Sequence, residues 1–305
     1  MKNYLPLTYP KMILLSIFFI ISGFSLCFSQ TKSQIIADGA ELTKVSSDYK
    51  FTEGPAVDAQ GNVYFTDQPN DRIMKWSEDG TITTFMEPAG RANGLYFDAE
   101  GNLFACADEH NQLWKITPEK LVTVVIENYE GQLLNGPNDL WIHPDGGLYF
   151  TDPFYKRPYW SRTEKEIQEQ NVYYLSPHKK MMEIAATDLV QPNGIIGTPN
   201  GKKLYVADIG DRKTYSFKIN KDGTLSDRKL FTEMGSDGMT IDSKGNVYLT
   251  GKGVTVFNKK GEEIEHISID EGWTANVTFG GKDRQTLFIT AMGSVYTLRM
   301  KVRGQ

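Results

Sequence analysis

The segment Glu53-Gly-Pro-Ala-Val-Asp-Ala-Gln-Gly-Asn-Val-Tyr-Phe-Thr-Asp67 joins a polar residue, a short apolar run, a glycine-containing turn and a second apolar run. Its opening recurs five more times, beginning at Asn93, Asn138, Asn193, Asp237 and Asn276. The six copies are separated by steps of 40, 45, 55, 44 and 39 residues, which is the period of propeller blades and comparable repeat arrays. The repeat therefore predicts six similar units, each of which opens with a side-chain oxygen.

Each repeat contains the pattern of four short strands. In the second copy these patterns cover residues 95–98, 103–107, 112–116 and 121–126. Four short strands per period are typical of an antiparallel blade, so we predict an all-β, six-bladed β-propeller. The sixth copy holds only three such patterns, and we expect segment 41–45 to supply the fourth strand and close the ring. A helical turn or two is expected only within residues 162–170.

Length and charge indicate one domain and a small-molecule partner. The chain has 305 residues and a net charge of -5, and the repeat predicts a single propeller domain over residues 30–305. Lysine and arginine are scattered along the chain, so no basic patch is expected for nucleic acid or for an anionic membrane surface. The repeat pattern sets no oligomeric state.

The N-terminus has the features of an export signal. Lys2 and Lys11 precede an apolar run over residues 12–29, which predicts a signal peptide over residues 1–29 and a secreted or periplasmic protein. An uncleaved membrane anchor is the alternative, because the run is close to the shortest length that spans a bilayer. After cleavage Cys106 is the only cysteine, so no intramolecular disulfide is expected, and we interpret Cys106 as a buried, inert thiol.

The first residues of the repeats suggest a metal site on the propeller axis. Glu53 and Asp237 offer two negative charges, and Asn138 and Asn193 add neutral oxygens. Such hard donors, with no Cys or His among the six positions, favour Ca²⁺. Four protein ligands would leave positions for water and substrate, which favours catalysis over a structural plug. Alternatively, these dipeptides only form turns, although Glu53-Gly-Pro and Asn276-Val suit turns poorly.

Five motifs together resemble the gluconolactonase, senescence-marker-protein and luciferin-regenerating-enzyme family of six-bladed propellers. They are Glu53-Gly-Pro, Arg91-Ala-Asn-Gly94, Asn135-Gly-Pro-Asn-Asp139, Gln191-Pro-Asn-Gly194 and Asp237-Gly-Met. The resemblance implies a calcium-class divalent metal held by Glu53, Asn193 and Asp237, with Asn138 close to the metal and in contact with substrate. It is strongest to the bacterial gluconolactonase branch, through Gly90-Arg-Ala-Asn-Gly94 and Thr151-Asp-Pro-Phe-Tyr155.

At one position the chain differs from the animal branch of this family. In the animal branch an arginine stands two residues before the asparagine matching Asn138, whereas this chain has Gly136. We therefore expect Arg91 to contribute to sugar recognition.

The metal site leads to the hypothesis of an exported, calcium-dependent lactone hydrolase acting on a sugar lactone such as gluconolactone. The metal would stabilise the oxyanion formed when water attacks the carbonyl. Asp237 is the predicted catalytic base, and a metal-bound hydroxide is an equally serious nucleophile. A phosphotriesterase or other ester hydrolase using the same metal, and a non-catalytic ligand-binding propeller, are the alternatives.

The loops at the mouth of the channel contain the predicted substrate-binding residues: Arg91, Asn93, His110, Asn135 and Tyr155. His110 is interpreted either as a donor to the leaving ring oxygen or as an exposed loop residue. The long loop over residues 153–170 is interpreted either as a lid over the substrate or as an excursion packed on its own blade. Four aspartates that close strands are expected to cap loop amides: Asp67, Asp108, Asp152 and Asp208.

Overall fold

The computed structural model of the protein describes residues 1–5, 32–177 and 182–305. The chain separates into two units, Met1–Lys32 and Ser33–Gln305, and every described strand lies in the second unit. The predicted cleavage site and the apolar run of the signal peptide lie outside the described residues. Among the residues that are described, no helix is long and apolar enough to cross a membrane.

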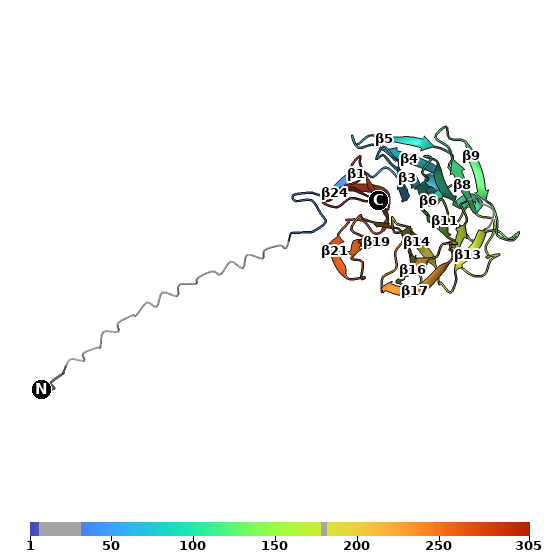
Figure 1. The fold of residues 1–305 in the computed structure, drawn as a ribbon. Coiled ribbons are helices and arrows are strands. Elements are labelled where there is room, and N and C mark those ends of the chain that lie inside the picture. The colour runs from blue at the N-terminus through green and yellow to red at the C-terminus, as the bar shows by residue number, and fades with distance from the viewer. Residues whose placement is uncertain (6–31, 178–181) are drawn as a thin grey trace. The chain divides into compact units, whose positions relative to one another are not determined.

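The described strands form six four-stranded antiparallel sheets, and these sheets follow one another around a ring in chain order (Figure 1). Consecutive strands pair within each sheet, from the innermost to the outermost. The predicted six-bladed propeller with four antiparallel strands per blade is therefore confirmed.

Blades 1 to 3 take up the first half of the propeller. Blade 1 consists of β2 (Thr52–Val57), β3 (Val63–Asp67), β4 (Arg72–Trp76) and β5 (Ile82–Met86). Blade 2 consists of β6 (Ala92–Phe97), β7 (Leu103–Ala107), β8 (Gln112–Ile116) and β9 (Val122–Ile126). Blade 3 consists of β10 (Leu140–Ile142), β11 (Leu148–Thr151), β12 (Val172–Leu175) and β13 (Met182–Ala186).

Blades 4 to 6 complete the ring. Blade 4 consists of β14 (Pro192–Gly197), β15 (Lys203–Asp208), β16 (Lys213–Ile219) and β17 (Leu225–Thr232). Blade 5 consists of β18 (Met239–Ile241), β19 (Val247–Gly251), β20 (Gly253–Phe257) and β21 (Glu263–Ile267). Blade 6 consists of β22 (Thr274–Gly280), β23 (Thr286–Ala291), β24 (Ser294–Arg299) and β1 (Thr43–Ser46).

The N-terminal strand of the propeller closes the ring, as the strand count predicts. Strand β1 pairs antiparallel with β24, with Lys44 opposite Tyr296. Thr52 of blade 1 adds a cross-link, because its hydroxyl donates to the Ser294 carbonyl at 3.0 Å. Strand β1 thereby covers the outer edge of β24, which would otherwise stay unpaired.

The helical turns expected within residues 162–170 are not present. This segment is irregular, and the only helices in the described part of the chain are two 3₁₀ turns, η1 (Gln68–Asn70) and η2 (Asp108–His110). Glu166 bonds to a neighbouring stretch instead: its carboxylate accepts from the Leu133 amide, and its backbone carbonyl accepts from the Gln132 side chain.

The hydrophobic core lies between neighbouring blades. One cluster joins blades 3, 4 and 5 around Trp141, Tyr205 and Leu249, and another joins blades 1 and 6 around Phe65 and Phe288. Burial of these large apolar side chains is the main stabilising contribution to the ring. Cys106 is fully buried in a third cluster, and burial raises the pKa of its thiol, as expected of an inert cysteine.

Candidate active site at the propeller axis

The repeat motifs lie in bulged inner strands. In four blades the pairing of the first two strands shifts at the motif: between Glu53 and Ala56, Ala92 and Leu95, Pro192 and Ile195, and Thr274 and Asn276. A bulge re-aims the side chain at that position. The motif residues in these blades therefore belong to strands, and the interpretation of the motifs as simple turns does not hold there.

The glycine that follows several motif residues permits close contact with the next blade. A Cβ on Gly94 would lie 2.5 Å from the Asn138 carbonyl oxygen, and one on Gly238 would lie 1.9 Å from Asn276 Cγ. Real side chains do not tolerate such distances, so only glycine fits. The repeated Asn-Gly and Asp-Gly dipeptides thus bring successive motif residues together around the axis.

Asn193 connects Asp237 and Tyr155 in a group of side chains at the axis, here called the axial cluster. Its Nδ2 lies 2.8 Å from Asp237 Oδ1 and 2.8 Å from the Tyr155 hydroxyl. Asp237 Oδ2 accepts a further hydrogen bond from Trp273 Nε1 at 2.6 Å. The structure therefore brings together three predicted site residues, and it adds Trp273, which lies outside every repeat motif.

Glu53 is buried beside this group. Its Oε2 accepts hydrogen bonds from the Gly54 amide at 2.8 Å and from Asn276 Nδ2 at 3.2 Å. Burial raises the pKa of Glu53, and the charge of Asp237 raises it further. Burial also raises the pKa of Asp237, although the hydrogen bonds from Trp273 and Asn193 oppose that change.

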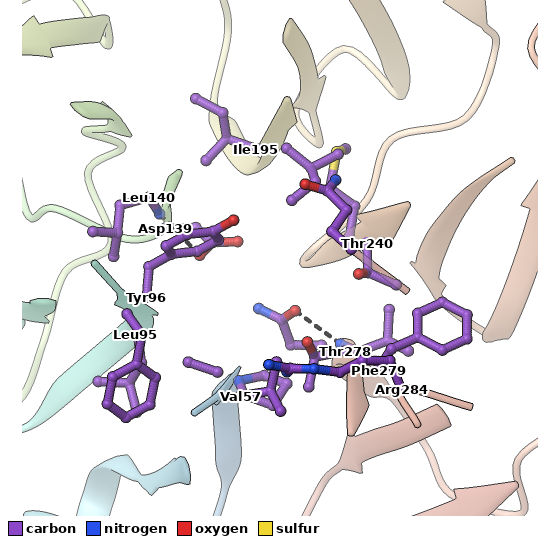
Figure 2. A pocket seen from close by; sticks show the side chains of 18 of the residues that line it. Val57, Leu95, Tyr96, Asp139, Leu140, Ile195, Thr240, Thr278, Phe279 and Arg284 are labelled. Atoms are coloured by element: carbon purple, nitrogen blue, oxygen red, sulfur yellow. Dashed lines mark hydrogen bonds between the residues drawn. The ribbon is translucent and has the colours of Figure 1, made fainter. Parts of the chain in front are cut away.

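A third carboxyl group, that of Asp139, lies on the wall of the channel. Burial raises the pKa of Asp139 to about 7. It borders a cavity of about 340 Å³ lined by the inner strands, where Figure 2 shows it close to Tyr96, with Arg284 further round the wall. Asp139 follows Asn138 in the third motif, so the Asn-Asp dipeptide was a sequence signal for a third acidic group at the axis.

These three acidic groups are not ion-paired with any described residue. Within residues 32–177 and 182–305, neither Glu53, Asp139 nor Asp237 forms a salt bridge. Buried carboxylates of this kind are normally paired or bound to a metal. The donor set therefore fits a divalent cation.

Amide oxygens would have to complete such a site. No three His, Cys, Asp or Glu side chains in the described part of the chain are placed to share a metal. Asn193 makes its hydrogen bonds through Nδ2, which leaves Oδ1 available, and Asn138 is buried with no side-chain hydrogen bond to another described residue. The Asn93 Oδ1 atom is also buried without a partner. Hard oxygen donors of this type suit Ca²⁺ better than Zn²⁺.

Three other predicted substrate-binding residues have mainly structural contacts. Asn135 is fully buried, and its Nδ2 donates to the Glu169 carbonyl at 2.8 Å. Arg91 Nη1 donates to the Pro69 carbonyl at 2.7 Å. His110 is exposed and its ring stacks on Trp114, with the ring centroids 5.5 Å apart.

Three of the four strand-closing aspartates cap loop amides, as expected. Asp67 accepts from Lys50 N, Asp152 from Asn135 N and Gly136 N, and Asp208 from Val190 N and Gln191 N. For Asp108 the expectation is wrong, because strand register places Ala107, and not Asp108, at the position of Asp67. The carboxylate of Asp108 is consequently free to contact another loop.

That other loop is the long segment 153–170, here called the blade-3 loop. The Tyr159 hydroxyl donates to Asp108 Oδ2, Arg157 Nε donates to the same oxygen at 2.9 Å, and Trp160 Nε1 donates to the Asp108 carbonyl at 2.9 Å. Gly136 makes room for this contact, since a Cβ there would lie 2.8 Å from the Trp160 ring. The blade-3 loop thus reaches across to blade 2, while its Tyr155 reaches Asn193 of blade 4.

A family model described as the SMP-30/Gluconolactonase/LRE-like region matches residues 51–293. The chain belongs to this family. The gluconolactonase of Zymomonas mobilis is 29% identical over 91% of this chain and 86% of its own length. The resemblance inferred from the five motifs is therefore confirmed.

Solved structures agree with the fold. A gluconolactonase from Xanthomonas campestris has a TM-score of 0.81 and 29% identity, and the match covers 87% of this chain and 90% of that one. Regucalcin from Agrobacterium tumefaciens, described as a calcium-binding protein, has a TM-score of 0.73 at 18% identity, over 88% of this chain and 96% of that one. At that identity the second match shows a shared fold alone.

Proposed function

We propose that the protein is an exported, calcium-dependent hydrolase of sugar lactones. The observation that carries this proposal is the pair of buried carboxyl groups of Glu53 and Asp237 at the axis, which interact through their charges and form no salt bridge with another described residue. Asn193 lies beside them, bonded to Asp237. Relatives named gluconolactonase and lactonohydrolase support the predicted class of enzyme, a hydrolase of carboxylic ester bonds. The hard oxygen donors at the axis support the choice of Ca²⁺ as the metal.

The cation would be held by Glu53, Asn138, Asn193 and Asp237. When bound, Ca²⁺ would polarise the lactone carbonyl and stabilise the negative charge that develops on its oxygen. The hydrogen bond from Asn276 to Glu53 and the one from Trp273 to Asp237 hold the two carboxylates in place. Groups of this kind, which orient the ligands, commonly affect metal affinity as strongly as some ligands do.

Asp237 is the proposed general base. Its carboxylate accepts the proton of the attacking water as the water oxygen bonds to the carbonyl carbon. The bond between that carbon and the ring oxygen then breaks, and the proton returns to the ring oxygen, so that one water and one lactone give one hydroxy acid. Tyr155 of the blade-3 loop lies against the cluster through its bond with Asn193, where it would limit the access of bulk water.

Export is the second part of the proposal. It is supported by Lys2, Lys11 and the apolar run over residues 12–29, which match the order of a signal peptide. Fractionation of cells that express the full chain with a C-terminal tag tests it. Recovery of the shortened chain outside the cytoplasm is expected, whereas recovery of the uncut chain in the membrane fraction would support the anchor instead.

A pH-indicator assay on the purified chain from residue 30 tests the activity. Glucono-1,5-lactone should be hydrolysed in the presence of Ca²⁺, and a chelator should abolish the activity without unfolding the propeller. Asp237→Asn should lower kcat by about 10²-fold or more. Asp145→Asn, a substitution in an exposed turn, is the control and should leave kcat unchanged. Activity that survives both chelation and Asp237→Asn would contradict the scheme. Turnover of a phosphotriester alone would favour the phosphotriesterase interpretation.

A further inference from the structure

Two of the arginines around the blade-3 loop are engaged in contacts within the protein. Arg91 donates from Nη1 to Pro69, lies 4.8 Å from the Tyr159 ring centroid, and its buried Nε lies 3.6 Å from Glu109 Oε1. Arg162 donates to the Asn135 carbonyl and stacks 4.4 Å from the Trp160 ring centroid, with Nε and Nη1 buried. Among the described contacts, this leaves Nη2 as the one guanidinium nitrogen of Arg91, and none of Arg162, that is neither enclosed nor engaged with another group.

Arg157 differs from both. Its Nε bonds to Asp108 Oδ2 at 2.9 Å, and its guanidinium carbon lies 5.2 Å from the Tyr155 ring centroid. Its Nη1 and Nη2 make no hydrogen bond with any other described residue, and neither atom is among the enclosed nitrogens. One edge of a fixed guanidinium therefore stays open, with two nitrogens side by side.

This open edge lies beside the axial cluster. The Tyr155 hydroxyl under Arg157 accepts the hydrogen bond of Asn193, which also donates to Asp237. The positive charge of Arg157 acts on both Tyr155 and Asp237. A substrate whose carbonyl reaches the cluster would bring its ring substituents near Arg157.

We propose that Arg157 determines specificity by donating from Nη1 and Nη2 to hydroxyl groups of a neutral, polyhydroxylated lactone. This inference rests on the proposed function and names its substrate class. A guanidinium presents parallel donors that match neighbouring hydroxyl oxygens. Asp108 already balances the charge of Arg157, and Glu53 and Asp237 would balance the two charges of the cation, so no positive charge is left over for an anion and a neutral substrate suits the site better.

The test compares three lactones with the Ca²⁺-loaded protein: glucono-1,5-lactone, δ-valerolactone, which has the same ring without hydroxyl groups, and 6-phosphoglucono-1,5-lactone. Arg157→Met should lower kcat/KM for gluconolactone by about 10- to 100-fold and leave that for δ-valerolactone nearly unchanged. Arg157→Lys should also lower kcat/KM for gluconolactone relative to kcat/KM for δ-valerolactone. Lysine keeps the positive charge but loses the paired donors. Arg212→Met, an exposed arginine of the corresponding blade-4 loop, is the matched control.

The δ-valerolactone rate shows whether each variant is folded and competent. An unchanged preference in Arg157→Met, an equal loss on both lactones in Arg157→Lys, or a loss of preference in Arg91→Met alone would overturn the inference. Preference of the unmodified protein for the phosphorylated lactone would overturn the neutral substrate class. If the unmodified protein hydrolyses none of the three, the proposed function itself fails.

Discussion

Asn276 and Glu53 are 223 residues apart in the sequence, yet Asn276 Nδ2 donates to Glu53 Oε2 at 3.2 Å. Asn276 opens the sixth repeat and Glu53 the first, so the bond spans the seam where the ring closes. The Oδ1 atom of Asn276 accepts from the Val277 backbone amide at 2.8 Å, which fixes the orientation of the Asn276 side chain. Asn276 is therefore placed to orient Glu53, and not to bind the cation itself.

Loss of that bond should weaken metal binding. Asn276→Ala leaves Glu53 with only the Gly54 amide, and we expect Ca²⁺ affinity to fall by about 10- to 100-fold. Isothermal titration calorimetry on chelator-treated protein measures the change. Thr278→Ala, two residues further along β22, is the control and should bind Ca²⁺ as the unmodified protein does. Equal affinities for Asn276→Ala and the unmodified protein would assign Asn276 a purely packing role.

The glycine of the fifth motif should tolerate no side chain. Gly238→Ala places a Cβ 1.9 Å from Asn276 Cγ, and the resulting displacement should cost about 3 kcal/mol or more of unfolding free energy. Urea denaturation measures this. Gly272→Ala provides the comparison, since nothing lies within 4 Å of a Cβ there, and its effect should stay within about 0.5 kcal/mol. Similar values for both variants would show that the blades can separate easily.

Asp139 should make the metal-free protein less stable as the pH rises. Burial raises the pKa of Asp139 from 3.8 to about 7, so the folded state holds the proton more tightly than the unfolded chain. The stability contribution is present in full below about pH 4 and is lost as the pH rises to about 7. Above that pH the buried charge costs up to about 4 kcal/mol.

Asp139→Asn should remove this pH dependence. The variant should be more stable than the unmodified protein at pH 8 in the presence of a chelator, and the two should converge near pH 4. Thermal unfolding from pH 4 to 8 measures the difference, which should shrink when Ca²⁺ is added, because a nearby cation favours the ionised carboxyl group. Parallel pH profiles for the two proteins would contradict the assignment.

Removal of β1 should open the ring. A chain that starts at residue 47 loses the pairing with β24 and the buried Ile35 side chain, and we expect its Tm to fall by about 5 °C or more. A chain that starts at Ser33 keeps both features and should melt like the full-length protein. Differential scanning calorimetry on the two chains separates them, and an unchanged Tm for the shorter chain would mean that β1 is dispensable.

Much of the fold was predictable because its signal is local. Each blade repeats a pattern of short apolar strands and glycine turns, so counting repeats sufficed to predict six blades. The missing strand of the last repeat pointed to β1 for the same reason. Glu53, Asn193 and Asp237 were predictable as a group because equivalent positions in a closed ring face one axis.

The residues that were missed have no periodic signal. Trp273 reaches Asp237 from a connecting segment that is not part of the repeat, and Arg157 meets Asp108 across two blades. The difference between Asp108 and Asp67 is a shift of one position, which strand pairing reveals and residue type does not.

Residue order along the chain thus established the number of blades, the closing strand and the polar residues that open each repeat, because those features depend on periods of apolar and turn residues within about 50 positions. Three features were decided only when the blades packed: the absence of a salt bridge to Glu53 or Asp237 within the described chain, the contact of the blade-3 loop with Asp108, and the open edge of Arg157. Burial, charge pairing and contact between distant segments are properties of the assembled ring, and no local pattern encodes them.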